Sequence, residues 1–404
     1  MRRTLAIDRV FTGTLLLLIL IGLVAVYSAC QGEDAGLGLD YWKKQIVFSV
    51  AGILALGLAA AIPHDVWDRA APVLYVLGLA SLAAVLVAGA TAGGATRWIS
   101  IGGFRFQPSE PAKIFTVLFL ARWLASRKRP PESLLALVPP VLITLLPMAL
   151  TLKQPDLGTA LVFLVPLFPM LFFRGASLRY LLLASSPVLS VICASSLPSW
   201  IVFSVVLLVL AYFSRAVLLE KIVWVAASVL AGIATPILWG RMEPYQQQRI
   251  IAFLDPARYS SGAGYQIIQS KIAIGSGGLT GVGFLEGTQK GLAFLPARHT
   301  DFIFGVIGEE FGFLGTMIVL GLFTVLLVRG LRIAASARDP FAVLTVVGIL
   351  SMLAFQVFVN IGVTLGLVPV TGLPLPIFSY GGTSLLSTLA GLGIVIGIGF
   401  RRRS

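Results

Sequence analysis

The sequence is poor in charge. Only 12% of its 404 residues are charged, whereas 57% are hydrophobic and the mean hydropathy is +0.95. Because a soluble domain carries roughly 25% charged residues, there is too little polar surface here to cover a water-soluble globule. In lipid every backbone polar group needs an internal partner, which leaves helical bundles or closed barrels. The apolar runs are long and do not alternate, so we expect an all-α polytopic membrane protein.

Cysteine and histidine are also scarce. The two cysteines, Cys30 and Cys193, lie far apart in apolar stretches, which argues against a disulfide framework or a thiolate metal site. Two histidines, His64 and His299, are too few to suggest a zinc site built on imidazole ligands. A cleavable signal peptide is not expected, because the first apolar run is long enough to span a membrane and lacks a small-residue cleavage pattern.

The net charge of +13 does not by itself indicate a nucleic-acid partner. In membrane proteins, excess Lys and Arg gather in cytoplasmic loops and against anionic lipid head groups. We therefore expect these basic residues to contact membrane lipids, and we expect no nucleic-acid partner.

Twelve stretches approach the length of about 20 apolar residues that a membrane span needs. They cover approximately residues 10–29, 44–62, 71–90, 107–125, 133–152, 157–173, 178–196, 199–214, 219–239, 301–328, 341–363 and 381–400. Only a few serines separate residues 178–196 from residues 199–214, so ten spans result if this pair is not a true hairpin.

The positive charges of the short loops predict the orientation. Arginines precede the first span and follow the last, so both termini are expected in the cytoplasm, and basic clusters follow the even-numbered spans. Residues 240–300 then form a large loop on the outer face. This loop is itself basic, which favours an anionic ligand; its cations are Arg241, Arg249, Arg258, Lys271, Lys290 and Arg298.

Three acids and a lysine stand out near the outer ends of the spans. Glu110 and Lys113 are three residues apart, which places them on one helical face near the outer start of the fourth span. They form either a structural ion pair or a contact to a ligand at the outer face. Asp156 directly precedes an apolar run, so it either caps that helix or contacts the large loop. Asp301 is a candidate cap of the tenth span.

The large loop has the composition of short helices lying on the membrane surface. Its glycine-rich run at 275–278 has the pattern of a phosphate-binding nest, although glycines also serve plain turns. Asp255 is the one Asp in the loop, and Pro256 after it disfavours continuation of a helix. We expect its carboxylate to be presented at a helix break, where it can act as a general base, or else to pair with a neighbouring arginine.

Two further segments are unusual. Glu309 and Glu310 are adjacent acids inside an apolar span, and ionisable groups within spans are functional candidates by default. Prolines at 369, 374 and 376 and the segment 379–384 predict a broken outer segment before the last span. Non-helical backbone at that depth is tolerated where it is buried in protein or lines a cavity.

These motifs, taken in order, resemble the shape, elongation, division and sporulation (SEDS) proteins over nearly the whole chain. The resemblance rests on residues 104–113, 154–159, 254–256, 264–266, 269–279, 299–302 and 379–382. The start of the chain, residues 7–29, is similar to the elongation branch (RodA), with the division branch (FtsW) as the nearest rival.

The resemblance implies a peptidoglycan glycosyltransferase that polymerises lipid II at the outer face of the cytoplasmic membrane, working with a class B penicillin-binding protein. It implies that Asp255 is the essential acid and that Glu110 and Lys113 take part. Together with the basic loop, it gives the expected substrate-binding residues: Glu110, Lys113, Asp156, Arg249, Arg258, Lys271, Ser276 and His299.

The chain departs from the family pattern in two places. Ala297 stands where the family usually has an acid, which weakens any role for an acid there but not for Asp255. The family core has ten spans, so residues 178–214 are expected to be an inserted helical hairpin, to which we assign no function.

The expected reaction is a single inverting displacement. Arg and Lys would bind the pyrophosphate of lipid II and stabilise the polyprenyl pyrophosphate leaving group, while Asp255 takes the proton of the acceptor 4-hydroxyl. A Mg²⁺ or Mn²⁺ ion bridging Asp255 and the pyrophosphate is a further option, although no ligand cluster indicates one. The alternatives are a lipid II flippase, which needs polar groups at mid-membrane depth, and a non-catalytic scaffold.

Overall fold

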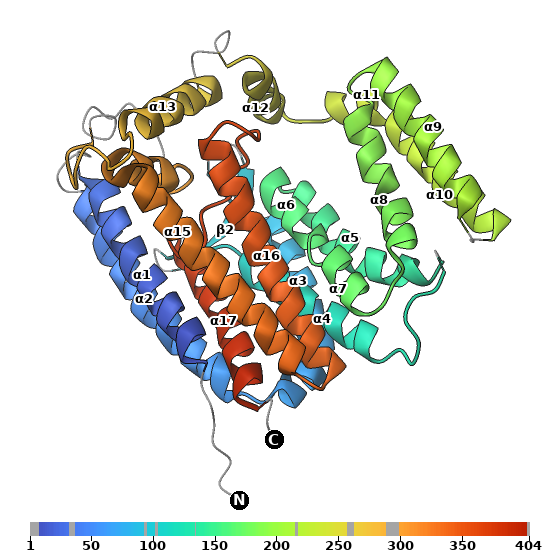
Figure 1. The fold of residues 1–404 in the computed structure, drawn as a ribbon, viewed down its shortest axis with the longest axis horizontal. Coiled ribbons are helices and arrows are strands. Elements are labelled where there is room, and N and C mark those ends of the chain that lie inside the picture. Colours follow the sequence, from blue (N-terminus) through green and yellow to red (C-terminus); the bar gives the residue numbers. More distant parts are fainter. Residues whose placement is uncertain are drawn as a thin grey trace, which may run out of the picture.

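The computed structural model describes residues 8–31, 37–92, 95–101, 104–133, 135–214, 217–256, 262–287 and 299–401. Helices dominate it (Figure 1). They are α1 (Arg9–Cys30), α2 (Leu37–Ala61), α3 (His64–Ala88), α4 (Ser109–Ala125), η1 (Leu135–Leu137), α5 (Val138–Leu152), α6 (Leu157–Leu164), α7 (Leu167–Phe173), α8 (Leu178–Cys193), α9 (Leu197–Phe213), α10 (Leu218–Ile233), α11 (Thr235–Gly240), α12 (Pro244–Leu254), α13 (Ala263–Ser276), α15 (Ile303–Ser336), α16 (Pro340–Thr364) and α17 (Gly382–Arg401).

The polytopic helical membrane fold is confirmed. Within the described ranges, seven helical segments are long and apolar enough to cross a membrane, those of α1, α2, α3, η1–α5, α15, α16 and α17. The other predicted spans also coincide with helices, which are shorter or divided. The predicted span 157–173, for example, is divided into α6 and α7 just before Pro166, which has no N–H to continue the hydrogen-bond ladder.

The core of the bundle is built by close approach of helices. Gly393 and Gly397 of α17 are four residues apart and face α2, where an added Cβ would lie 2.3 Å from the carbonyl oxygen of Leu56 and 2.7 Å from that of Ala60. Such a spacing of small residues lets helix backbones pack tightly in a membrane. Helices α1, α2, α4, α15, α16 and α17 thereby form one packed unit.

Helices α8, α9, α10 and α11 stand beside this unit (Figure 1). The pair α8 and α9 covers the predicted hairpin 178–214, and α8 contacts α10 through the hydroxyls of Ser186 and Ser228, 2.7 Å apart. The interpretation of this hairpin as an insertion stays a prediction.

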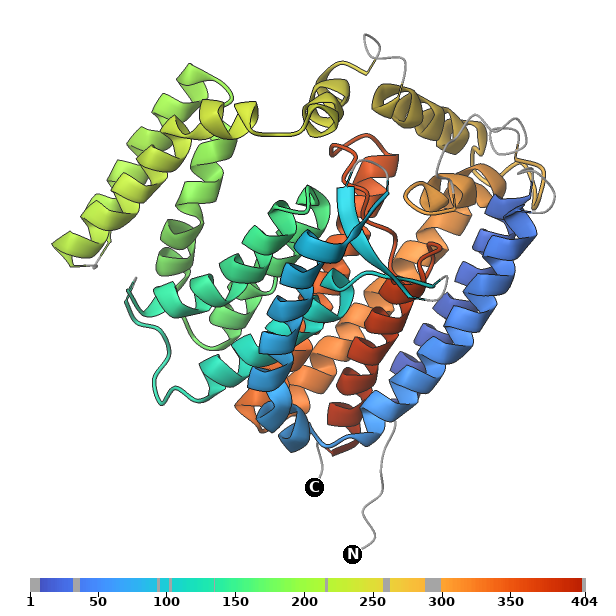
Figure 2. The same ribbon diagram turned by 180° about the vertical axis from the view of Figure 1, so that it is seen from behind.

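The purely helical expectation missed a small sheet. Strands β1 (Ala90–Ala92), β2 (Ala95–Ile101) and β3 (Phe104–Phe106) form an antiparallel sheet in the order β1-β2-β3, which lies among the helices in Figure 2. The sequence holds the signal, because Gly-Gly pairs at 93–94 and 102–103 separate short runs with β-branched and aromatic residues.

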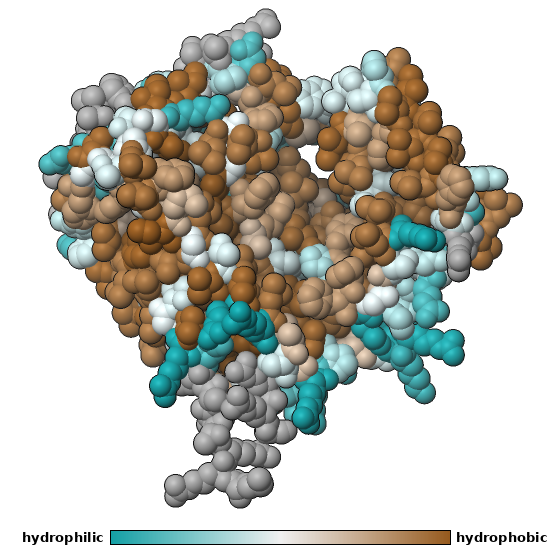
Figure 3. Space-filling view, viewed as in Figure 1, coloured by the Kyte–Doolittle hydropathy of each residue, from teal (hydrophilic) through white to brown (hydrophobic). Residues whose placement is uncertain are grey.

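The two ends of the bundle differ. Helix α1 begins and α17 ends at one end, which we call the terminal end (Figures 1 and 2). Helices α12 and α13 lie across the opposite end, the loop end, which confirms the short helices expected in residues 240–300. Figure 3 shows hydrophilic side chains gathered at the terminal end below a broad hydrophobic surface.

Candidate functional site

Helix α12 presents Asp255 at the loop end. The helix begins after Glu243, whose N–H donates to the Gln246 side chain at 3.0 Å, and it ends at Leu254. The N–H of Asp255 still donates to the carbonyl of Ile251 at 3.0 Å, and Asp255 itself is exposed. The structure therefore places Asp255 at a helix break, as expected. Its predicted neighbour Arg258 lies outside the described residues.

The turn before α6 fixes the position of α12. The carbonyl oxygen of Pro155 accepts hydrogen bonds from the Tyr245 hydroxyl and from Gln246 Nε2 (3.4 Å), both on α12. It also accepts one from Arg97 Nη2, at 2.8 Å. Because one carbonyl joins α12, the α5–α6 turn and strand β2, the three elements are held in one arrangement.

Asp156 has the expected capping role, and its link to the large loop is indirect, through Arg97. Its carboxylate caps α6, accepting from the Thr159 N–H at 3.1 Å and the Thr159 hydroxyl at 2.9 Å. The same carboxylate lies 3.5 Å from Arg97 Nε, and Arg97 Nη2 lies 3.2 Å from the Tyr245 hydroxyl on α12. The sequence reasoning missed Arg97, although an arginine between two apolar runs is a signal that could have found it.

A second Arg–Asp association lies beside the first. Asp301 is partly buried and does not cap α15, whose N-cap residue is Phe302. Burial raises the pKa of the Asp301 carboxyl, and the positive charge of Arg249 opposes that rise. Arg249 also lies over the Tyr245 ring, 5.6 Å from its centroid. Arg97, Asp156, Arg249 and Asp301 therefore gather beneath α12.

These groups adjoin a cavity of about 310 Å³, which we call the α12 cavity. Arg97 and Arg249 are the charged residues in its lining. The lining is otherwise mostly apolar and comes from α6, α12, α16 and residues 368–373; it includes Leu157, Leu161, Ile250, Phe355, Phe358, Val359, Val368 and Val370. Phe358 is 70% exposed, so the cavity opens at the side of the bundle. Figure 3 shows the surface hollowed between α12–α16 and the α8–α11 group.

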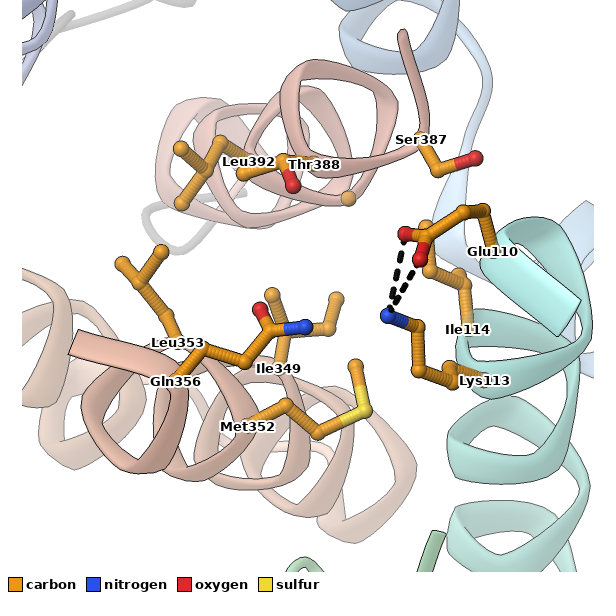
Figure 4. A pocket seen from close by; sticks show the side chains of 11 residues that line it. Glu110, Lys113, Ile114, Ile349, Met352, Leu353, Gln356, Ser387, Thr388 and Leu392 are labelled. Atoms are coloured by element: carbon orange, nitrogen blue, oxygen red, sulfur yellow. Dashed lines mark hydrogen bonds and ion pairs between the residues drawn. The ribbon is translucent and has the colours of Figure 1, made fainter. Parts of the chain in front are cut away.

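Glu110 and Lys113 form a buried ion pair, deeper than expected. Lys113 Nζ lies 2.9 Å from each Glu110 carboxylate oxygen (Figure 4). The pair lines a cavity of about 30 Å³ with residues 349–356 of α16 and 387–392 of α17. Those stretches are the middle of both helices, so the expectation of a position at the outer face is wrong. Because the chain forms strands β2 and β3 first, α4 begins inside the bundle.

The remaining expected binding residues do not line the α12 cavity. Lys271 of α13 packs over Gly366, where an added Cβ would lie 2.7 Å from its Nζ. The Ser276 hydroxyl donates to the Ala273 carbonyl of its own helix at 2.8 Å. His299 stacks on Tyr41 with ring centroids 4.9 Å apart.

The glycine-rich segment serves packing, and the expectation of a phosphate nest at 275–278 is wrong. The N–H groups of Gly277 and Gly278 donate to the carbonyls of Ala273 and Gly275. The following residues instead dock against α15, which breaks at Gly312 (φ 63°). Four backbone hydrogen bonds of 2.9–3.2 Å join the two segments: Val282 N to Glu309 O, Gly283 N to Glu310 O, Phe313 N to Gly278 O and Leu314 N to Leu279 O.

The adjacent acids of α15 are both buried at this break. Glu310 accepts a hydrogen bond of 2.5 Å from the Ser28 hydroxyl of α1. Glu309 faces the docked segment, since a Cβ added to Gly287 would lie 2.9 Å from Glu309 Oε2. Their positions connect α15 to α1 on one side and to residues 282–287 on the other.

Comparisons with known proteins agree over the whole length of the chain. A family model for cell cycle proteins of the FtsW/RodA/SpoVE type matches residues 8–197 and 181–404. The chain is 40% identical to the peptidoglycan glycosyltransferase MrdB of Escherichia coli K12, over 98% of this chain and 95% of that protein. It is 35% identical to the peptidoglycan glycosyltransferase RodA of Treponema pallidum, over 98% of both chains.

Two solved structures are similar in fold. A chain from a peptidoglycan synthase complex, described as coordinating polymerization and crosslinking, matches with a TM-score of 0.73 at 34% identity over 98% of both chains. The rod shape determining protein RodA of Thermus thermophilus matches with a TM-score of 0.66 at 31% identity over 99% of both chains.

Proposed function

Because the chain belongs to the FtsW/RodA/SpoVE family of cell cycle proteins, we propose that it is a peptidoglycan glycosyltransferase that polymerises lipid II into β-1,4-linked glycan. The observation that carries the proposal is the exposed Asp255 at the end of the helix that lines the α12 cavity. Arg249 precedes Asp255 by six residues, or about 9 Å along a helix axis, so an acid and a cation lie within the span of one lipid-linked sugar.

The α12 cavity suits the lipid end of such a substrate. Its apolar walls and lateral opening fit the first isoprene units of a polyprenyl chain, which can enter from the membrane. Arg97 and Arg249 fit the pyrophosphate, because guanidinium groups bind phosphate oxygens in paired hydrogen bonds. Asp156 and Asp301 position the two guanidinium groups beforehand, which lowers the entropy lost on binding.

The proposed reaction needs one base. The Asp255 carboxylate takes the proton of the acceptor 4-hydroxyl as its oxygen forms a bond to the anomeric carbon of the donor. The bond between that carbon and the pyrophosphate oxygen breaks, and the electron pair leaves with the polyprenyl pyrophosphate. Arg97 and Arg249 stabilise the negative charge that develops there. Attack on the face opposite the leaving group converts an α-linked donor into a β-linked product.

A Mg²⁺ or Mn²⁺ ion at the pyrophosphate belongs to the proposal. Among the described residues, no three His, Cys, Asp or Glu side chains form a metal-binding group. Such an ion would take most of its ligands from phosphate and water, as Mg²⁺ commonly does, with Asp255 as the protein ligand within reach.

The proposal also covers orientation and partner. We place the loop end outside the cytoplasmic membrane and both termini in the cytoplasm, because arginines gather near both chain ends. A class B penicillin-binding protein is the proposed partner, supported by the similarity to a chain from a complex that polymerises and crosslinks. The elongation role is supported by higher identity to MrdB (40%) than to an FtsW protein of Geobacter (34%).

One observation favours the second candidate, a lipid II flippase. Glu110, Lys113 and Gln356 lie at mid-depth, where a transport path needs polar groups. Their cavity, about 30 Å³, holds a water molecule and not a sugar pyrophosphate. The polymerase is therefore the better-supported function.

The test is polymerisation of lipid II by the purified chain, with and without the penicillin-binding protein. We expect glycan from wild type and a loss of about 10²–10⁴-fold in rate for Asp255→Asn. Glu286→Gln, which removes another exposed carboxylate of the loop, should keep the wild-type rate. Full activity of Asp255→Asn would overturn the assignment of the base. Absence of glycan in all samples, with lipid II crossing vesicles, would favour the flippase.

A further inference from the structure

We propose a second lipid site at the terminal end, which binds the phosphate of an anionic glycerophospholipid. The site is a cavity of about 190 Å³ between the end of α4, the start of α5 and the end of α7, which we call the α4 cavity. It lies at the end of the bundle opposite Asp255 and shares no lining residue with the α12 cavity.

Three guanidinium groups distinguish the α4 cavity from the surrounding surface. Arg127, Arg129 and Arg174 all line it, and none of the described residues in its lining is acidic. Two other arginines at this end are paired with acids: Arg122 lies 2.9 Å from Asp68, and Arg329 lies 3.3 Å from Asp8. Three like charges around one cavity repel one another, and a bound anion relieves that repulsion.

Two of these arginines are held in place. Arg174 Nε donates to the Leu124 carbonyl at 3.0 Å, and its Nη2 donates to the Arg127 carbonyl, so it covers the end of α4. The Arg127 guanidinium lies over the ring of Trp123, 4.4 Å from the centroid. A guanidinium group has five N–H donors, so each of the two arginines keeps further donors for phosphate oxygens beyond these contacts.

The rest of the lining indicates a lipid and not a soluble phosphate. Leu124, Ala136 and three prolines form an apolar wall on the same cavity. Beside it, α7 exposes Phe172 (56%) and Phe173 (50%) to the membrane, and α5 exposes Leu142 (58%), so acyl chains have an apolar surface next to the arginines. Trp123 is partly buried, as a residue at head-group depth commonly is.

The chemistry therefore matches an anionic phospholipid of the leaflet at the terminal end. Basic pockets between membrane helices bind such head groups, and each nearby Lys or Arg adds appreciably to the affinity. A zwitterionic lipid carries the same phosphate, but its ammonium group would be repelled by the three arginines. The inference does not depend on the proposed reaction at the loop end.

The test is native mass spectrometry of the full chain released from vesicles containing equal phosphatidylglycerol and phosphatidylcholine. We expect wild type to retain phosphatidylglycerol and Arg127→Gln/Arg129→Gln to retain it roughly thirtyfold more weakly. The matched control is Lys128→Gln/Arg179→Gln, which removes the same charge at the same end from residues outside the cavity lining. It should retain the lipid as wild type does.

Three outcomes would overturn the site. Equal loss in the control variant would mean that general surface charge holds the lipid. Equal retention of phosphatidylcholine would remove the selectivity for an anion, and displacement by millimolar glycerol 3-phosphate would show a soluble anion site. The thermal midpoint of each variant, measured without added lipid, shows whether a variant that loses the lipid is still folded. Lipid II polymerisation is measured separately, so that failure of the lipid site and failure of the proposed reaction can be distinguished.

Discussion

Arg97 Nε lies 3.5 Å from the Asp156 carboxylate and joins the small sheet to the turn before α6. The pair is nearly enclosed, since the Arg97 side chain is 19% exposed and that of Asp156 is 5% exposed. The turn in turn holds α12 through the Pro155 carbonyl. Asp255 is thus positioned by a buried charge pair that lies outside its own helix.

Asp156→Asn tests this support. Asparagine keeps an oxygen that can cap α6 but removes the charge opposite Arg97, so we expect a loss of about 1–3 kcal/mol in stability. The thermal midpoint in detergent measures it. Asp65→Asn, at a 73% exposed side chain, should change stability by less than about 0.5 kcal/mol. Equal shifts in both variants would contradict the role of the pair.

Arg249 is expected to act through its planar fork as well as its charge. Arg249→Lys keeps the charge but loses the bidentate geometry for phosphate. Lipid II polymerisation should therefore fall in the order wild type, Arg249→Lys, Arg249→Gln, with the Gln variant reduced by roughly 10²-fold or more. A Lys variant as slow as the Gln variant would show that the charge contributes nothing, and a Lys variant as fast as wild type would show that the planar fork is not needed.

The ion pair of Glu110 and Lys113 should behave as a coupled unit. Glu110→Gln leaves a buried ammonium group without its carboxylate, which costs about 3–5 kcal/mol. Glu110→Gln combined with Lys113→Met removes both charges and should be less destabilising than Glu110→Gln alone. Thermal midpoints of the two single variants and the double variant measure the coupling, and additive losses would rule it out.

Asp301 gives a pH dependence with a defined sign. Burial raises the pKa of its carboxyl above the usual 3.8. The folded state therefore holds the proton longer, so its stability is greatest below the unfolded pKa and falls as pH rises through the folded pKa. Asp301→Asn should flatten this part of the profile. Arg249→Gln should extend it to higher pH, because the opposing charge is gone. Thermal midpoints of the three proteins between about pH 4 and 8 measure this pH dependence. A pH profile of Asp301→Asn identical to that of wild type would refute the role of Asp301.

The break in α15 should require glycine. An alanine at Gly312 would adopt a φ of 63°, and its Cβ would lie 2.3 Å from the Gly281 N. We expect Gly312→Ala to lose more than about 2 kcal/mol. Gly321 of the same helix has no atom within 4 Å of an added Cβ, so Gly321→Ala should be neutral or slightly stabilising. A stable Gly312→Ala would mean that the break can rearrange.

The sequence predicted local features well. The apolar runs located the helices, and Pro256 located the end of α12, because both depend on neighbouring residues in the chain. The capping role of Asp156 followed from its position before an apolar run. The Gly-Gly pairs at 93–94 and 102–103 also indicated short strands. The prediction missed them because long apolar runs on both sides favoured membrane-spanning helices.

Properties that depend on distant segments could not be predicted. The depth of Glu110 and Lys113 depends on where the sheet ends and α4 begins. The association of Arg249 with Asp301 joins residues 52 positions apart. The residues that neighbour either one in the sequence do not indicate the other as its partner. The glycines at 277–278 have the composition of a nest, but their N–H groups donate to the carbonyls of Ala273 and Gly275.

The backbone hydrogen bonds across the break in α15 join the loop end of that helix and residues 278–283 into one rigid unit. Helix α13 leads directly into this unit and contacts α12. A tilt of α15, such as a neighbouring membrane helix could impose, would be carried by α13 to α12 and would shift Asp255 relative to the cavity. The position of Asp255 is therefore coupled, through α13, to the tilt of a membrane helix that contributes no residue to the α12 cavity.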